Sequence, residues 1–256
     1  MAQDSEKEIQ QLKNRFHDLA DKSFRQGIFT FTGFLSLSEQ EVFWREEAGL
    51  KHAGYRLYGG REDAERVMVR FGNEEELGYQ APFPIVCVHI SPLQQKFADA
   101  LSHRDFLGAL MNLGIQRSTL GDIMTGQTDA YLFCTDTIAP FICENLEQVR
   151  HTHVRCVVTE ECENLPQEEP ELVSVQVQSL RVDAVLAKVY NLSREKSLEL
   201  FRAGKVYVNG RLCENNSRVL KAGETVNVRG FGKFTLRGEP RETRKGKQSV
   251  DAAVFR

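Results

Sequence analysis

Residues 180–210 constrain the fold of this 256-residue chain more than any other stretch. Apolar side chains recur there at helical spacing and predict a short helix with one buried face, formed by Val182, Val185, Leu186 and Val189. After a break at Asn191, Ser193 can cap a second helix, because its hydroxyl can accept a hydrogen bond from an unpaired backbone N–H. Gly204 ends that helix, and Asn209-Gly210 after an alternating strand predicts a tight hairpin. The stretch therefore predicts two packed helices followed by a β-hairpin.

The two parts of the chain carry opposite charge. Residues 180–256 hold 17 Lys and Arg against 8 Asp and Glu, a net charge of +9. Residues 1–179 hold 16 against 28, a net charge of −12, and the whole chain has a net charge of −3. A basic surface attracts the phosphate backbone of nucleic acid, whereas an acidic surface repels it. The charge pattern therefore predicts nucleic-acid binding at the C-terminal end only.

The basic stretch resembles the S4 RNA-binding domain, in which two helices present basic side chains to folded RNA. The resemblance covers roughly the last third of the chain and is carried by Arg181-Val-Asp183 with Leu186, by Ser193-Arg194, and by Ala203-Gly-Lys-Val-x-Val-Asn-Gly210. It implies phosphate contacts by the basic side chains. Asp183 is a carboxylate on this basic face, and it is expected to orient Arg181 or a backbone N–H rather than to touch RNA, which would repel it. The residues expected to bind RNA are Arg181, Ser193, Arg194, Lys196, Arg202, Lys205, Asn209, Arg229 and Lys233.

The rest of the chain predicts an α+β protein with two further units. Residues 1–65 are expected to form a helical N-terminal unit, with helices over 3–26 and from a capping box at Ser38-x-x-Glu41. Residues 66–160 alternate between strand and helix patterns and predict a ferredoxin-like (RNA-recognition-like) middle domain. The expected strands are 67–71, 83–90, 121–124, 130–134 and 153–159, and the expected helices are 103–113 and 137–149. Residues 161–172 read as an acidic linker, and residues 173–247 as the S4 domain with a basic tail over 237–247.

A second resemblance concerns the middle domain. Ser102-His-Arg-Asp-Phe-Leu-Gly-Ala-Leu110, followed by Leu113-Gly-Ile-x-Arg117 and Gly121-Asp-Ile123, is similar to the signature of the bacterial YlmH family, whose members carry an S4 domain after this one. The resemblance implies an RNA-binding protein that associates with the large ribosomal subunit carrying peptidyl-tRNA, in the rescue of stalled translation. Members of the family are also linked with cell-division genes.

Several function classes have no support in the sequence. The six cysteines show no two-residue spacing typical of zinc or redox motifs, and His151-x-His153 has no third ligand in view. Neither a signal peptide nor an apolar stretch of membrane-spanning length is present. We therefore expect a cytoplasmic monomer with reduced thiols, no cofactor, no metal and no catalytic residue.

Two alternatives to a ribosome-bound factor stay open. The first is an RNA-modifying enzyme that uses the S4 domain for targeting, which requires a deep pocket with convergent polar groups within residues 60–160. The second is a cell-division adaptor whose acidic N-terminal and middle parts bind a protein partner.

Some individual side chains also have two interpretations. Arg104 and Asp105 are expected to brace the start of the predicted helix 103–113, and Asp122 to pair with Arg117. Surface contact of Arg104 or Arg117 with RNA is the alternative. Arg229-Gly-Phe-Gly232 fits a tight turn better than a base-stacking motif.

Overall fold

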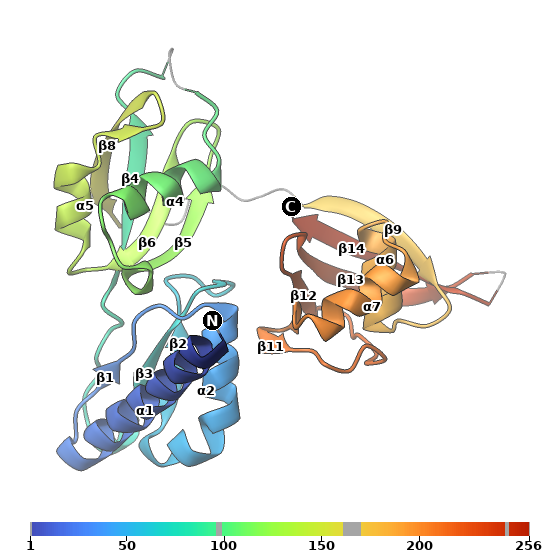
Figure 1. Ribbon diagram of the computed structural model, residues 1–256, viewed down its shortest axis with the longest axis horizontal. Coiled ribbons are helices and arrows are strands. Elements are labelled where there is room, and N and C mark those ends of the chain that lie inside the picture. Colours follow the sequence, from blue (N-terminus) through green and yellow to red (C-terminus); the bar gives the residue numbers. More distant parts are fainter. Residues whose placement is uncertain (1, 96–98, 161–169, 244–245, 256) are drawn as a thin grey trace. The chain divides into compact units, whose positions relative to one another are not determined.

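The computed structural model describes residues 2–95, 99–160, 170–243 and 246–255, and it confirms the predicted α+β class (Figure 1). The chain divides into two compact units, Met1–Gln167 and Glu168–Arg256. Most of the predicted acidic linker, residues 161–169, lies outside the described residues.

The N-terminal part contains the expected helices and also a small antiparallel sheet of order β1-β3-β2. Its elements are α1 (Ala2–Gln26), β1 (Thr30–Phe31), α2 (Leu37–Leu50), a 3₁₀ turn (Lys51–Ala53), β2 (Tyr55–Tyr58), β3 (Met68–Phe71) and α3 (Glu74–Leu77). The capping box of α2 uses Ser36 and Glu39 rather than Ser38 and Glu41. Strand β3, which the sequence analysis assigned to the middle domain, pairs with β1 and β2, because alternation marks a strand without specifying its partner.

The middle domain has one antiparallel sheet of order β5-β6-β4-β8-β7. Its elements are β4 (Ile85–Pro92), α4 (His103–Asn112), a 3₁₀ turn (Arg117–Thr119), β5 (Leu120–Thr125), β6 (Ala130–Thr135), α5 (Ala139–Asn145), β7 (Gln148–Val149) and β8 (Thr152–Thr159). Leaving out the short β7, the element order and strand order are those of the ferredoxin-like plan. Helix α5 ends earlier than predicted, since Gln148 and Val149 pair with β8 as a strand.

The two faces of this middle sheet are covered differently. Buried side chains of α4 and α5, including Phe106 and Ile142, pack with sheet residues in one core. On the opposite face, Phe133 is buried in a cluster with Phe34 and Met68 of the N-terminal part. The N-terminal part therefore covers the centre of the face that the helices leave free.

The C-terminal unit is a six-stranded antiparallel sheet of order β11-β10-β12-β13-β14-β9 with two short helices. Its elements are β9 (Glu171–Val177), α6 (Val182–Val189), α7 (Arg194–Arg202), β10 (Val206–Val208), β11 (Arg211–Leu212), β12 (Thr225–Val228), β13 (Gly232–Glu242) and β14 (Gln248–Phe255). The sheet continues past residue 247, where the sequence analysis ended the domain, because β14 lies between β13 and β9. Of the expected basic tail over 237–247, residues 237–242 thus belong to β13, and residues 244 and 245 lie outside the described residues.

Candidate nucleic-acid interface

Helices α6 and α7 form as their sequences predict. The apolar residues Val182, Val185 and Leu186 of α6 are fully buried. The Ser193 hydroxyl accepts a hydrogen bond from the Lys196 backbone N–H at 3.2 Å and so caps α7. Capping explains why a serine stands at this position. Residues 193–196 are exposed, so the N-terminus of α7 faces solvent.

A groove of about 890 Å³ lies beside the N-terminus of α7. It is bordered by the end of β9, by α6 and by the segment that enters α7, and it gathers four cationic side chains and one carboxylate: Arg181, Lys188, Arg194, Lys247 and Asp183. Three of the predicted site residues, Arg181, Ser193 and Arg194, line this groove.

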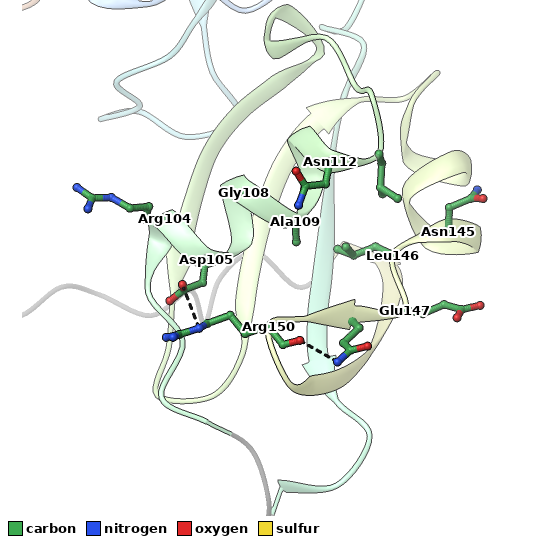
Figure 2. A pocket seen from close by; sticks show the side chains of 11 residues that line it. Arg104, Asp105, Gly108, Ala109, Asn112, Asn145, Leu146, Glu147 and Arg150 are labelled. Atoms are coloured by element: carbon green, nitrogen blue, oxygen red, sulfur yellow. Dashed lines mark hydrogen bonds and ion pairs between the residues drawn. The ribbon is translucent and has the colours of Figure 1, made fainter.

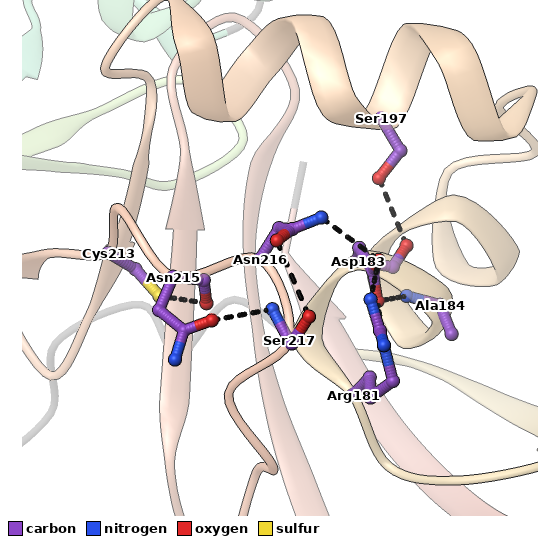
Figure 3. A network of polar contacts seen from close by, with 8 residues as sticks. All are labelled: Arg181, Asp183, Ala184, Ser197, Cys213, Asn215, Asn216 and Ser217. Atoms are coloured by element: carbon purple, nitrogen blue, oxygen red, sulfur yellow. Dashed lines mark hydrogen bonds and ion pairs between the residues drawn. The ribbon is translucent and has the colours of Figure 1, made fainter.

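A polar network fixes Arg181 at the edge of the groove (Figure 3). Its guanidinium donates two hydrogen bonds to the Asp183 carboxylate, at 3.0 and 2.7 Å, and this contact raises the pKa of Arg181. Asp183 is 5% exposed and also accepts hydrogen bonds from the Ala184 backbone N–H and the Asn216 side chain. The expectation that Asp183 orients Arg181 thus agrees with the geometry. Truncating Arg181 would leave a buried carboxylate short of partners.

Arg194 and Lys188 are cations that can be tested without disturbing this network. Both side chains belong to exposed residues and line the groove. The unpaired N–H groups at a helix N-terminus attract anions, and α7 begins at Arg194 beside this groove. The groove therefore combines a helix N-terminus with four cations, an arrangement suited to binding phosphate groups.

The other predicted residues lie away from the groove. Arg202, Lys205 and Arg229 are exposed and form a second basic cluster at the far end of α7, where the Arg229 backbone N–H donates to the Lys205 carbonyl at 2.9 Å. Lys196 pairs with Glu199 at 3.1 Å, and the ammonium of Lys233 lies 5.1 Å from the centre of the Phe255 ring.

Arg229-Gly-Phe231 forms a tight turn between β12 and β13. The Phe231 backbone N–H donates to the Val228 carbonyl at 2.9 Å, and Gly230 has a positive φ of 87°. The Phe231 ring lies 5.4 Å from that of Tyr190 and packs against the core. The geometry thus agrees with a turn, and Phe231 is engaged within the protein.

Two groove residues were not among the predicted site residues. Lys188 lies two helical turns after Arg181, a spacing that places both residues on one helix face. This spacing could have indicated that Lys188 belongs to the same site as Arg181. Lys247 directly precedes β14, and the pairing of β14 with the distant strand β9 brings it to the groove.

Asn209 has a structural contact that gives a test of its role. Its φ is +51°, and its side-chain oxygen accepts a hydrogen bond from the Thr225 backbone N–H at 2.9 Å. We expect Asn209→Ala to lower the free energy of unfolding by about 1–2 kcal/mol, because it removes this bond and places alanine at a positive φ. Urea denaturation would measure this loss. If the role of Asn209 is structural, RNA affinity should stay unchanged, whereas a clear loss of affinity in the still-folded variant would support the predicted RNA contact of Asn209.

The arginines of the first unit have distinct positions. The Arg117 guanidinium donates to the Leu120 and Gly121 carbonyls, and its burial lowers the pKa of Arg117 to about 10. The prediction that Asp122 pairs with Arg117 was wrong. The Asp122 carboxylate instead accepts hydrogen bonds from the Glu65 and Arg66 backbone N–H groups. Arg117 is therefore a structural residue, whereas Arg104 is exposed.

The described residues form no three-ligand metal cluster, and two of their cysteines have unreactive thiols. Across residues 2–95, 99–160, 170–243 and 246–255, no three His, Cys, Asp or Glu side chains come together in a way that could hold a metal ion. Burial raises the pKa of the Cys134 and Cys156 thiols to about 12, so neither is a thiolate nucleophile at neutral pH. Among the helices of these same residues, none has the length and apolar character needed to span a membrane.

Comparisons with known families agree with this organisation. Residues 79–163 match the family model described as "Putative RNA-binding domain in YlmH", and residues 180–226 match that of the S4 domain. The chain is thus an S4-domain protein of an RNA-binding class.

A curated relative defines the family. The chain is 30% identical over 223 residues to the "Ribosome-associated protein quality control protein P2" of Bacillus subtilis (strain 168), which covers 86% of this chain and 84% of that protein. The chain belongs to the YlmH family. Among solved structures it is similar to the "Cell division protein ylmH from Streptococcus pneumoniae", at 18% identity and a TM-score of 0.47, over 62% of this chain and 94% of that one.

Proposed function

We propose that this protein binds the large ribosomal subunit and acts in the rescue or quality control of stalled translation, where it contacts rRNA and peptidyl-tRNA. The observation that carries the proposal is the groove of the C-terminal unit, which places Arg181, Lys188, Arg194 and Lys247 around the N-terminus of α7. Folded RNA is recognised largely through its phosphates and its shape. The cations of a basic groove can contact the phosphates, and its walls can fit the shape of the RNA.

The relative from Bacillus subtilis supports the ribosomal part of the proposal. Its name describes a ribosome-associated quality control protein, and the two chains align over most of their lengths. The second basic cluster, Arg202, Lys205 and Arg229, would contact another part of the same RNA. We further propose that the protein works as a cytoplasmic monomer without catalysis.

The geometry favours binding over RNA modification. A groove with polar residues does occur within residues 60–160, lined in part by Asp105. Hydrogen bonds from the Ser102 hydroxyl and backbone N–H lower the pKa of Asp105, so this carboxylate stays ionised and serves the helix cap. A carboxylate committed in this way is poorly suited to general acid–base catalysis.

Sedimentation of the tagged protein from bacterial lysate tests the proposal. We expect the wild-type protein to migrate with large ribosomal subunits in a sucrose gradient, and Lys188→Ala/Arg194→Ala, which leaves the Arg181–Asp183 network intact, to stay at the top. Migration of both proteins with the subunits would show that the groove is not the contact. If the wild-type protein stays at the top with a protein partner, the adaptor role is favoured instead.

A further inference from the structure

Strand β9 forms one edge of the C-terminal sheet, and no other strand in the described part of the chain pairs with its outer side (Figure 1). Its inner side pairs with β14 over all seven residues, from Glu171 to Val177, without a bulge. A regular strand at the edge of a sheet presents a row of unpaired N–H and C=O groups that can template another strand. The outer side of β9 therefore has the geometry to accept one more strand.

The backbone groups on this outer side belong to Leu172, Ser174 and Gln176. The Leu236 backbone N–H of β13 donates to the Glu224 carbonyl at 3.2 Å, so the backbone groups of Leu236 point away from β14. Backbone groups alternate in direction along an antiparallel strand. When this alternation is followed through the paired residues of β13, β14 and β9, the odd-numbered residues of β9 face β14. The N–H and C=O groups of Leu172, Ser174 and Gln176 therefore face outward.

This edge has none of the features that usually prevent pairing with another chain. Natural sheets protect their edges with lysine, proline, bulges or very short strands. Residues 171–177 contain neither lysine nor proline, and their one charged residue is Glu171 at the start. By contrast, the edge strands β11 and β7 have two residues each, and the Gln148 side chain of β7 donates to the Arg150 carbonyl at 2.8 Å (Figure 2). The long edge of β9 is thus left open for a partner.

Leu172 is an apolar side chain that packing within the chain leaves uncovered, at 72% exposed. The side chains of Val175 and Val177 are buried in the core, so alternation places Leu172 on the opposite face of the sheet. A residue on an added strand would lie directly beside Leu172 and cover it. A polypeptide supplies this apolar contact together with N–H and C=O groups at the spacing of a strand. The edge therefore fits a protein segment better than a nucleic acid.

Positive charge surrounds the C-terminal end of β9. Val177 lines the groove beside the N-terminus of α7, together with Lys188, Arg194 and Lys247. Lys247 directly precedes β14, whose first residue pairs with Val177. A strand that adds to β9 would bring its own side chains to this end, where the cations attract acidic residues and repel basic ones. The charge of the groove thus selects a segment that is acidic at one end.

We propose that the outer edge of β9 binds an extended segment of a partner protein, which adds to the sheet as an antiparallel strand. The acidic N-terminal end of the segment lies beside Lys188, Arg194 and Lys247, and an apolar residue near its other end lies beside Leu172. In such complexes main-chain hydrogen bonds give affinity, and alternate side chains give specificity. This binding site does not depend on the RNA contact proposed above, although the acidic end would compete with RNA phosphates for the same cations.

Residue-resolved amide hydrogen exchange of the full-length protein tests the site, with the synthetic peptide Glu-Glu-Glu-Thr-Val-Thr-Val-Thr-Val as the probe. We expect saturating peptide to slow exchange at Leu172, Ser174 and Gln176 by about tenfold or more, because each outward N–H gains a hydrogen bond. Val173 and Val175 should change much less, since their N–H groups already face β14. This alternation along β9 is the signature of an added strand.

Variants of the edge and of its charged end give a second readout, by fluorescence anisotropy of the labelled peptide. Ser174→Pro removes one outward N–H at an edge position, where proline is tolerated, and should weaken binding about tenfold or more. Ser174→Thr keeps the N–H and should bind as the wild-type protein does. Lys247→Glu should weaken binding of this peptide and strengthen binding of the same peptide with lysine in place of glutamate. Circular dichroism would show that each variant is folded.

The outcomes separate strand addition from its alternatives. Absence of peptide binding, or binding that Ser174→Pro leaves unchanged, would overturn the proposed site. Protection confined to residues 193–196 would mean that the cations alone capture the peptide, which overturns it as well. Protection of β9 that rises with protein concentration in the absence of peptide would assign the edge to a second copy of the chain instead. Loss of the proposed ribosome binding would leave the protection pattern of β9 unaffected, so the two proposals can fail separately.

Discussion

Replacing both Lys188 and Arg194 with glutamate is expected to weaken binding to purified large ribosomal subunits by about 100-fold or more. The estimate assumes two charged hydrogen bonds to phosphate of about 1.5 kcal/mol each, to which repulsion by the new carboxylates adds. Both residues are exposed and line the groove beside the N-terminus of α7, and neither belongs to the Arg181–Asp183 network. The fold should therefore survive the change.

Co-pelleting with subunits over a series of salt concentrations would measure the effect. The slope of log affinity against log salt should fall by about one for each phosphate contact that is lost. Lys221→Glu/Arg237→Glu is a matched control, because it makes the same charge change at exposed positions of the same unit outside the groove. Equal weakening by the two double variants would mean that net charge, and not the groove, determines binding.

Local signals explain which parts of the interface the sequence could predict. The cap that Ser193 provides for α7 and the positive φ of Asn209 in the hairpin could both be predicted. Each of these features depends on residues only a few positions away in the sequence. Lys247 could not be found in this way, since it reaches the groove through the pairing of β14 with β9, two strands that are far apart in the sequence. Strand β14 itself gives a weak signal, because its buried face combines Val250 and Val254 with the small Ala252.

The same limit applies to the first unit. The pattern over residues 67–71 marks a strand, but pairing with the short β1 and β2 depends on contacts that sequence spacing does not show. Burial of Phe133 by the N-terminal part is equally non-local. The ferredoxin-like plan could be predicted from element order alone, whereas the coverage of its free face could not.

Loss of the Arg66 side chain is expected to destabilise the first unit strongly. Its guanidinium donates hydrogen bonds to the Leu120 carbonyl at 2.9 Å, the Phe34 carbonyl at 3.0 Å and the Arg117 carbonyl at 3.1 Å. Arg66 thus joins the N-terminal part to the middle domain. Its burial lowers the pKa of Arg66, and this unfavourable desolvation is offset by the three hydrogen bonds.

We expect Arg66→Ala to reduce the free energy of unfolding of this unit by about 3 kcal/mol, because three carbonyls lose a charged donor together. Trp44, the only tryptophan, lies in α2 and reports on this unit in urea denaturation followed by fluorescence. Arg56→Ala, on an exposed arginine of β2, should change the free energy by no more than about 0.5 kcal/mol. An equally small effect of Arg66→Ala would mean that apolar contacts such as Phe34 with Phe133, rather than Arg66, hold the two parts of the unit together.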